Sequence, residues 1–401
     1  MRYKIIIIII AMFMLNGLNN SREINDLAIV SAIGVNKIDD KNYRVSAIVL
    51  NPTKEDGGSS SSSSSSKMTV YEGVDTTIQE AIRKMILESP RRLYLAHMEL
   101  LLISESVAKE DLTNALDFFI RDNEGSNEFL FVMTKDVEPR EVLKIKSPGE
   151  EIPSENIVKS IEATAKYMGI TTENLLNDSI EYILEEGEEL VMPSIRVEEE
   201  KSESSSESNE KEQSGSKKEE SSNEENKKII IDTLAYFKDN KLQGYLNEDE
   251  SRVYNILRNK FKSGVIKVES ADRLVAEFIK CDSNIKPKYE NGEYVIDIEV
   301  KGTCNITEIG EKISDVNYSN IKEYETLIEQ KIYTDIQKYI FNCQNIYEAD
   351  LSGFGKIFRE KLNKEYKKIK DNFYTDIFKN IKTNISVDIS FPNDGGINKR
   401  W

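Results

Sequence analysis

The chain has 401 residues, with 54 Lys and Arg against 71 Asp and Glu, which gives a formal net charge of −17. An acidic chain repels the phosphate backbone, so general nucleic-acid binding is disfavoured. Three cysteines cannot build a disulfide framework, and a single histidine excludes metal sites made of several histidines. At roughly 100–200 residues per domain, the length predicts two or three domains.

The N-terminus has the pattern of a signal peptide, which we assign to residues 1–17. Arg2 and Lys4 precede the unbroken apolar run Ile5–Leu15. As a helix this run would span roughly 16 Å, about half of a ~30 Å hydrocarbon core, so it is too short for an ordinary transmembrane helix. The following Leu15-Asn16-Gly17-Leu18 has the shape of a lipobox, but Leu18 stands where a lipobox has cysteine. Leu18 has no thiol to carry a diacylglyceryl group, so we expect membrane association through the signal segment or through partner proteins.

Residues 21–147 are predicted to form an N-terminal α+β domain. Helices alternate with β-rich runs along this block, which is typical of a sheet covered by helices. Thr76 and Thr77 can cap the first helix, whose apolar residues recur at helical spacing. The segment 57–67, with eight consecutive serines, is predicted to be a flexible loop. The expected strands are 43–50, 98–104 and 129–134, and the expected helices are 78–87 and 112–120.

Residues 148–261 are predicted to form a middle α+β domain. Lys238-Asp239-Asn240-Lys241 separates two β-rich runs and predicts a hairpin. The segment 198–228 holds 11 acidic and 6 basic residues, with serine filling most of the rest. Such a composition cannot bury an apolar core, so we expect a disordered acidic loop between two strands. The expected helices are 157–168 and 172–183, and the expected strands are 191–197, 229–237 and 242–246.

Residues 262–395 are predicted to form a C-terminal α+β domain. Apolar residues at helical spacing indicate a long helix over 321–341, and alternation at Ile385, Val387 and Ile389 indicates a last strand. Further strands are expected at 265–269, 274–280 and 294–301, with more helix over 354–378. Residues 356–400 carry 11 basic and 6 acidic residues, which fits either contact with an anionic lipid surface or a solvated helix face. The fold class is therefore α+β, with three consecutive mixed α/β domains and mostly antiparallel sheets.

A search for catalytic or binding motifs yields no catalytic, cofactor-binding or metal-binding residue, and no cofactor is expected. His97 opens an apolar run and is interpreted as structural, and Cys281, Cys304 and Cys343 are interpreted as small buried residues. Gly353-Phe354-Gly355 starts like a dinucleotide fingerprint but lacks the third glycine and a preceding strand. Pairs of acids such as Glu185-Glu186 and Glu188-Glu189 lie in runs that we interpret as solvated, so paired-carboxylate catalysis is weakly supported.

A set of short segments then occurs in a specific order. SREINDLAIVSAIGV directly follows the predicted signal peptide at 21–35, and the other segments are TIQEA at 77–81, the stretch 93–102 with Ala96-His97, DFFIRD at 117–122, AYFK at 235–238, KLQGYL at 241–246 and DLSGFG at 350–355. In this collinear order, from Ser21 to about Asp394, the chain resembles the Ger(x)C-type spore germination lipoproteins, the C subunits of germinant receptors. Family members usually carry cysteine at Leu18 and often tryptophan at Asn19, and usually tryptophans at Tyr366 and Phe373.

The resemblance implies three α+β domains in a non-catalytic, exported protein at the outer face of the spore inner membrane. It also implies that the protein acts together with a polytopic A subunit and a transporter-like B subunit in nutrient-triggered germination. The membrane surface is a further implied partner. No nucleic acid or small-molecule ligand is expected. The alternative, an extracytoplasmic carboxylate-dependent hydrolase, needs two acids about 5–9.5 Å apart in one cleft.

Overall fold

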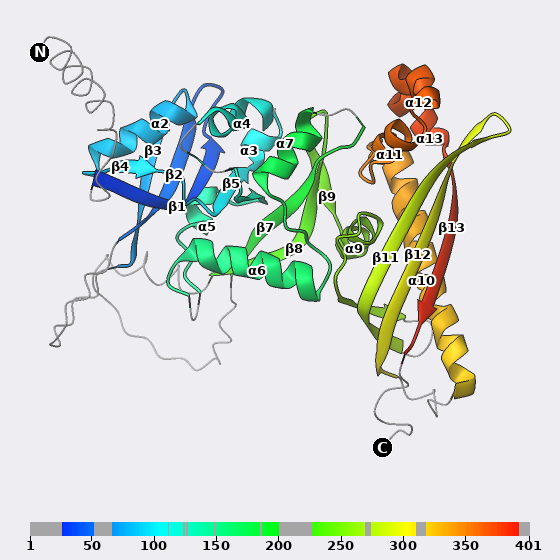
Figure 1. Ribbon diagram of the computed structural model, residues 1–401. Helices are drawn as coiled ribbons and strands as arrows, with labels where there is room; N and C mark the ends of the chain where they lie inside the picture. The colour runs from blue at the N-terminus through cyan, green and yellow to red at the C-terminus, as the bar shows by residue number, and fades with distance from the viewer. Residues whose placement is uncertain are drawn as a thin grey trace, which may run out of the picture.

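The computed structural model describes residues 26–51, 66–110, 112–122, 125, 127–147, 150–184, 187–199, 227–268, 274–309 and 318–392. The predicted signal peptide and Leu18 lie outside these residues, as do residues 57–65 of the Ser-rich loop and residues 200–226 of the acidic loop. The described residues form two sheets, one built from the N-terminal half of the chain and one from the C-terminal part (Figure 1).

The first sheet has nine strands and spans residues 27–246. Its order is β3-β2-β1-β5-β6-β7-β8-β9, and β4 pairs with β1 off this path. The strands are β1 (Leu27–Lys37), β2 (Tyr43–Leu50), β3 (Met68–Asp75), β4 (Arg92–Tyr94), β5 (Leu100–Ser104), β6 (Leu130–Thr134), β7 (Val191–Glu199), β8 (Lys227–Lys238) and β9 (Lys241–Leu246).

The pairing in this sheet is mixed, so the expectation of mostly antiparallel strands holds for its outer strands only. β1, β5, β6 and β7 pair in parallel at the centre, and only the outer strands on both sides are antiparallel. Met133 of β6 pairs with Ser194 of β7, so the sheet continues across the boundary that we expected near residue 148. The α+β class is confirmed, but the two mixed sheets do not show three domains.

Both hairpins expected in the second block are present. β7 pairs antiparallel with β8, and this ladder includes Glu198 and Glu199, so the ends of the predicted acidic loop belong to strands rather than to the loop. β8 and β9 turn through Asp239 and Asn240, whose φ angles of 51° and 60° are those of a tight primed turn. Asn and Asp tolerate this left-handed conformation better than most residues.

Helices cover the two faces of the first sheet, each with its own apolar core. α2, α4 and α7 share one core with the sheet, and α5 and α6 share the other. The Thr77 side chain caps α2 by accepting from the Glu80 N–H at 3.1 Å, as the sequence predicted. The helices are α2 (Ile78–Lys84), the 3₁₀ turn η3 (Met85–Leu87), α3 (Glu105–Ala108), α4 (Leu112–Arg121), α5 (Pro139–Val142), α6 (Pro153–Tyr167) and α7 (Leu176–Leu184).

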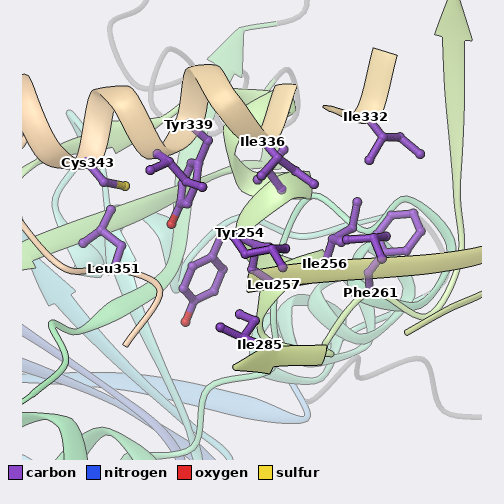
Figure 2. Packing of buried hydrophobic residues seen from close by; sticks show 14 of the residues in the cluster. Tyr254, Ile256, Leu257, Phe261, Ile285, Ile332, Ile336, Tyr339, Cys343 and Leu351 are labelled. Atoms are coloured by element: carbon purple, nitrogen blue, oxygen red, sulfur yellow. The ribbon is translucent and has the colours of Figure 1, made fainter. Parts of the chain in front are cut away.

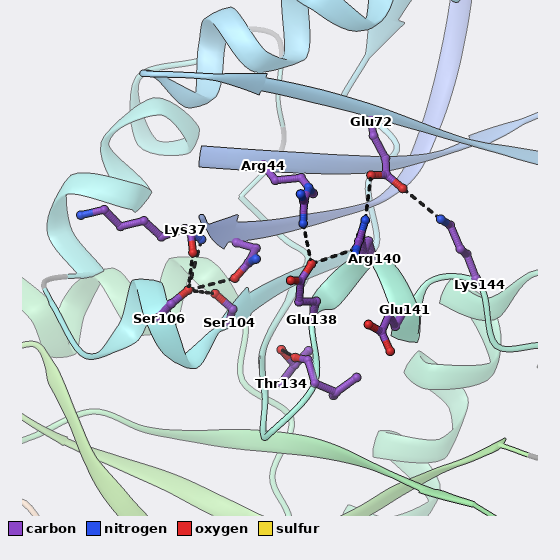
Figure 3. A network of polar contacts seen from close by, with 12 residues as sticks. Lys37, Arg44, Glu72, Ser104, Ser106, Thr134, Glu138, Arg140, Glu141 and Lys144 are labelled. Carbon is purple, nitrogen blue, oxygen red and sulfur yellow. Dashed lines mark hydrogen bonds and ion pairs between the residues drawn. The ribbon is translucent and has the colours of Figure 1, made fainter. Parts of the chain in front are cut away.

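A chain of ion pairs fixes α5 to the neighbouring strands (Figure 3). Glu138 accepts from Arg44 of β2 at 2.8 Å and pairs with Arg140 at 2.8 Å. Glu72 of β3 accepts from Lys144 at 2.9 Å. These side chains are all partly exposed, so the network orients α5 on the sheet and contributes only a modest part of the stability.

The second sheet has the order β10-β11-β12-β13, with antiparallel pairs except for β12 and β13, which are parallel. The long helix α10 packs along it, and short helices follow (Figure 1). Tyr366 and Phe373, where the resemblance places tryptophans, are both buried here. The elements are β10 (Gly264–Val268), β11 (Leu274–Glu290), β12 (Glu293–Glu308), α10 (Tyr318–Asn345), α11 (Phe354–Lys361), α12 (Asn363–Ile369), η5 (Lys370–Asn372), the π-helical turn η6 (Phe373–Ile377), α13 (Phe378–Asn380) and β13 (Lys382–Ser390).

Helix α9 (Glu248–Leu257) connects the two sheets and was not expected from the sequence. It contacts β8 and β9 of the first sheet and β11 and α10 of the second. Tyr254 and Leu257 enter the C-terminal core beside Ile336 and Tyr339 of α10 (Figure 2). A capping box starts the helix, because the side chain of Asn247 accepts from the Glu250 N–H while that of Glu250 accepts from the Asn247 N–H.

Candidate functional site

Several buried polar groups of the described residues meet at the junction between the two sheets. The segment Gly187–Leu190, which leads from α7 into β7, lies against the loop that leads into α11. The backbone N–H of Glu189 donates to the Asp350 carbonyl at 3.2 Å, and the N–H of Lys356 donates to the Gly187 carbonyl at 2.9 Å. These bonds join residues that are far apart in sequence, so the DLSGFG segment at 350–355 contacts the segment that enters β7 of the first sheet.

Asp350 holds the shape of this loop. Its fully buried carboxylate accepts from the backbone N–H groups of Phe354 at 3.0 Å and Gly355 at 2.7 Å, which are the first donors of α11. Burial raises the pKa of Asp350 to about 7, while these two hydrogen bonds oppose the shift. Gly353 precedes α11 with φ at 72°, a conformation that favours glycine. Gly353, the first glycine of the Gly353-Phe354-Gly355 motif, thus starts a helix rather than a nucleotide-binding loop.

A buried ion pair lies directly beside the loop. Arg258, at the end of α9, pairs with Glu188, whose side chain is only 3% exposed, and also donates to the Ser352 carbonyl at 3.1 Å. Burial raises the pKa of Glu188, and the charges of Arg258 and Lys356 oppose that shift. Lys356 in turn donates to Glu181 of α7 at 2.7 Å. The interpretation of Glu188-Glu189 as a solvated acidic pair is therefore wrong, because the tertiary fold buries Glu188 and half-buries Glu189.

A second buried carboxylate, Glu250 of α9, joins this helix to the end of α10. It accepts from the Tyr347 hydroxyl at 2.6 Å and from the Asn342 side-chain amide at 2.7 Å. The Tyr347 ring lies 4.5 Å, between ring centroids, from that of Tyr236 on β8. The sequence offered one signal for this group, the Asn247-to-Glu250 capping spacing, which our sequence analysis missed.

The described grooves do not bring these acids together for catalysis. One groove of about 610 Å³ lies between α9, β10 and α10, and one of about 580 Å³ lies between α2 and α4. Glu188 and Asp350 line neither of them. In the first groove Asp249 is paired with Arg252 at 2.9 Å, and in the second Asp117 is paired with Arg121 at 2.7 Å. A hydrolytic pair of carboxylates would instead need to share an open cleft.

The histidine and the three cysteines singled out from the sequence differ in their exposure to solvent. His97 is exposed before β5, with its ring in edge contact with Tyr94 at 5.9 Å, so it does not lie in the core as expected of a structural histidine. Cys281, Cys304 and Cys343 are buried free thiols, as expected. Within the described ranges no cluster of three or more His, Cys, Asp or Glu side chains has the arrangement of a metal site. In the same ranges, no helix is long and apolar enough to cross a membrane.

Comparison with known proteins defines the class. Residues 20–197 match the family described as the spore germination protein N-terminal domain, and residues 232–395 match the family described as spore germination B3/GerAC-like, C-terminal. Spore germination protein KC of Bacillus subtilis is 26% identical over 379 residues, covering 92% of this chain and 89% of the relative. Spore germination protein B3 of the same organism is 22% identical and covers 94% of both chains.

The fold comparison agrees with the sequence matches. The crystal structure of the GerBC protein superposes with a TM-score of 0.56 and 18% identity, covering 90% of this chain and 97% of that chain. The chain therefore belongs to the GerAC-type family of spore germination proteins. Within this family it is a C subunit of a germinant receptor, and it is not an enzyme. The resemblance stated from the sequence is confirmed, and the hydrolase alternative is disfavoured.

Proposed function

We propose that this chain acts as a non-catalytic subunit at the outer face of the spore inner membrane, in contact with an A and a B membrane subunit. Membership in a germinant receptor family implies such partners, and proteins of this family are typically membrane-anchored lipoproteins. The apolar run Ile5–Leu15 supports export and attachment by the N-terminus.

The observation that carries the proposal is the buried junction between the sheets. Glu188 pairs with Arg258, which also donates to the Ser352 carbonyl of the DLSGFG loop. The Asp350 carbonyl of this loop accepts from the Glu189 N–H, and Glu250 ties α9 to α10. A buried ion pair of this kind resists relative movement of the two parts, because separation would leave Glu188 and Arg258 each without its charged partner. A subunit built in this way presents fixed surfaces to partner proteins instead of a cleft for a substrate.

The test is to delete, in the spore-forming organism, the gene that encodes this chain. We expect dormant spores that form normally but fail to germinate with the nutrient of this receptor, and restoration by the wild-type gene. A tagged chain purified from spore membranes should bring the A and B subunits with it. Normal nutrient germination of the deletion strain, with other receptors also deleted, or purification without these subunits, would contradict the proposal.

A further inference from the structure

The edge of the first sheet that carries β4 is where the described chain begins. β1 starts at Leu27, which pairs with Arg92 of β4 in a parallel register. The first described strand therefore begins next to β4. From Leu15, the end of the apolar run, to Leu27 there are only twelve residues. Fully extended, twelve residues reach about 40 Å at most, so the start of β1 lies no farther than this from any bilayer that holds the apolar run.

The same edge exposes apolar side chains on η3. Met85 is fully buried, whereas Ile86 is 41% exposed and Leu87 is 86% exposed, the largest fraction among the large apolar side chains of the described residues. The turn that follows is held in place, because the Ser89 hydroxyl donates to the Arg91 carbonyl at 3.0 Å. Ile86 and Leu87 thus project from a fixed turn and not from a frayed end.

Basic residues flank these two residues in the sequence of an otherwise acidic protein, although the acid Asp122 lines the same hollow as Ile86 and Arg83. Residues 83–92 hold four basic residues and a single acid, Glu88. Arg83 and Arg91 are exposed, and neither has an ion pair within the part of the chain that the structure describes. Arg stems pack on apolar surface while their charged ends reach phosphate groups, a combination typical of membrane interfaces.

We propose that Ile86 and Leu87 enter the interface of an anionic bilayer while Arg83 and Arg91 contact its phosphate headgroups. This inference rests on the membrane location proposed above and adds which face meets the lipid. A bilayer fits better than a protein, because two apolar side chains fall far short of the roughly 800 Å² that each partner buries in a stable interface. Juxtaposed basic residues also gain from the negative potential of anionic lipids.

The first experiment uses the full chain bound to vesicles of phosphatidylglycerol and phosphatidylethanolamine that contain brominated acyl chains. A Leu87→Trp variant reports lipid contact by quenching, and a Met168→Trp variant is its control. Met168 is 49% exposed and follows α6, on the opposite face of the sheet. The natural Trp401 gives a background that is measured in the parent chain. We expect at least threefold stronger quenching at position 87 than at 168, and equal quenching would overturn the proposal.

Flotation of the same vesicles distinguishes a failure of this inference from a failure of the proposed membrane location on which it rests. A wild-type chain that does not float with the vesicles refutes both, whereas flotation without quenching at position 87 refutes the lipid-facing edge alone. A second reporter, Ile86→Trp, is measured with and without the double substitution Leu87→Glu, Arg91→Glu. Provided that the thermal unfolding curve is unchanged, the double substitution should reduce the quenching of Trp at position 86 several-fold. If that double variant loses the A and B subunits while quenching stays unchanged, a protein occupies this edge and the proposal is wrong.

Discussion

Arg258 of α9 and Glu188 of the segment before β7 form an ion pair between parts of the chain that the sequence gives no reason to connect. The Arg258 side chain is 16% exposed and that of Glu188 only 3%. Both lie beside the loop at Asp350, so the pair belongs to the contact between the two sheets.

Replacing Arg258 by Ala should destabilise the protein strongly. The variant leaves the Glu188 carboxylate buried without its main partner, and losing one member of a buried pair typically costs about 3–5 kcal/mol. The free energy of unfolding from urea titration is the measurement. Lys382→Ala is the matched control, because Lys382 pairs with Glu293 where both side chains are more than half exposed, and we expect at most about 1 kcal/mol there. Equal effects of the two variants would show that Arg258 and Glu188 are not coupled in the folded state.

Glu189 should make stability depend on pH. Burial, followed by the charge of Asp239, raises the pKa of Glu189 to about 7 from 4.5. The folded chain therefore binds more protons than the unfolded chain between these values, and the contribution of Glu189 to the free energy of unfolding falls as the pH rises through this window.

In the wild type the Glu189 carboxylate accepts a hydrogen bond from the Asp239 N–H at 3.2 Å. The Glu189→Gln variant removes the titrating group and keeps a side-chain oxygen that can accept this bond. Between pH 4.5 and pH 8 we expect the variant to gain about 2 kcal/mol relative to the wild type, after allowance for partial exposure. Urea unfolding at several pH values measures the difference. Stability curves that run parallel over this range would contradict the raised pKa.

Gly353 should not tolerate a side chain. Its φ of 72° is unfavourable for other residues, and a Cβ there would lie 2.6 Å from Nη1 of Arg258 and 3.1 Å from Cδ of Glu188. Gly292, in the turn between β11 and β12, has a φ of 85° but no heavy atom within 4 Å of such a Cβ. We expect Gly292→Ala to lower the free energy of unfolding by about 1–2 kcal/mol from backbone conformation alone. Gly353→Ala should lower it by a further ~1 kcal/mol or more, because of the added contacts. Equal losses in thermal unfolding would mean that the junction yields to the added methyl group.

The three thiols should be unreactive in the folded protein. Burial raises the pKa of Cys281 and of Cys304 to about 12, and it raises that of Cys343 as well. Because the thiolate is the reacting species, a disulfide reagent at pH 8 should label none of them until denaturant is added. Ile346→Cys is the control, since Ile346 is 63% exposed and its replacement should react at once. Labelling of a natural cysteine at the rate of this control would show that its core segment opens in the folded state.

Local patterns predicted the elements where burial follows a simple period. The Thr77 cap, the turn at Asp239-Asn240 and the alternating strand around Val387 are all present as expected. Each depends on residues within one or two turns of one another, so the sequence alone carries the information. Helix α9 was missed even so, because polar residues such as Glu250, Ser251 and Asn255 are buried in it together with apolar ones, so its burial does not follow the apolar pattern of the sequence.

By itself the sequence determined the class of the elements, the buried thiols and the family. Only the tertiary structure decided that β6 and β7 pair, so that two expected domains share one sheet, and that Glu188 meets Arg258 beside Asp350. The local sequence around a strand edge or a charged residue does not indicate which distant residue it will contact. Which residues meet depends on the packing of whole layers, and that packing buries Glu188, which we interpreted as solvated, at the junction between the two sheets.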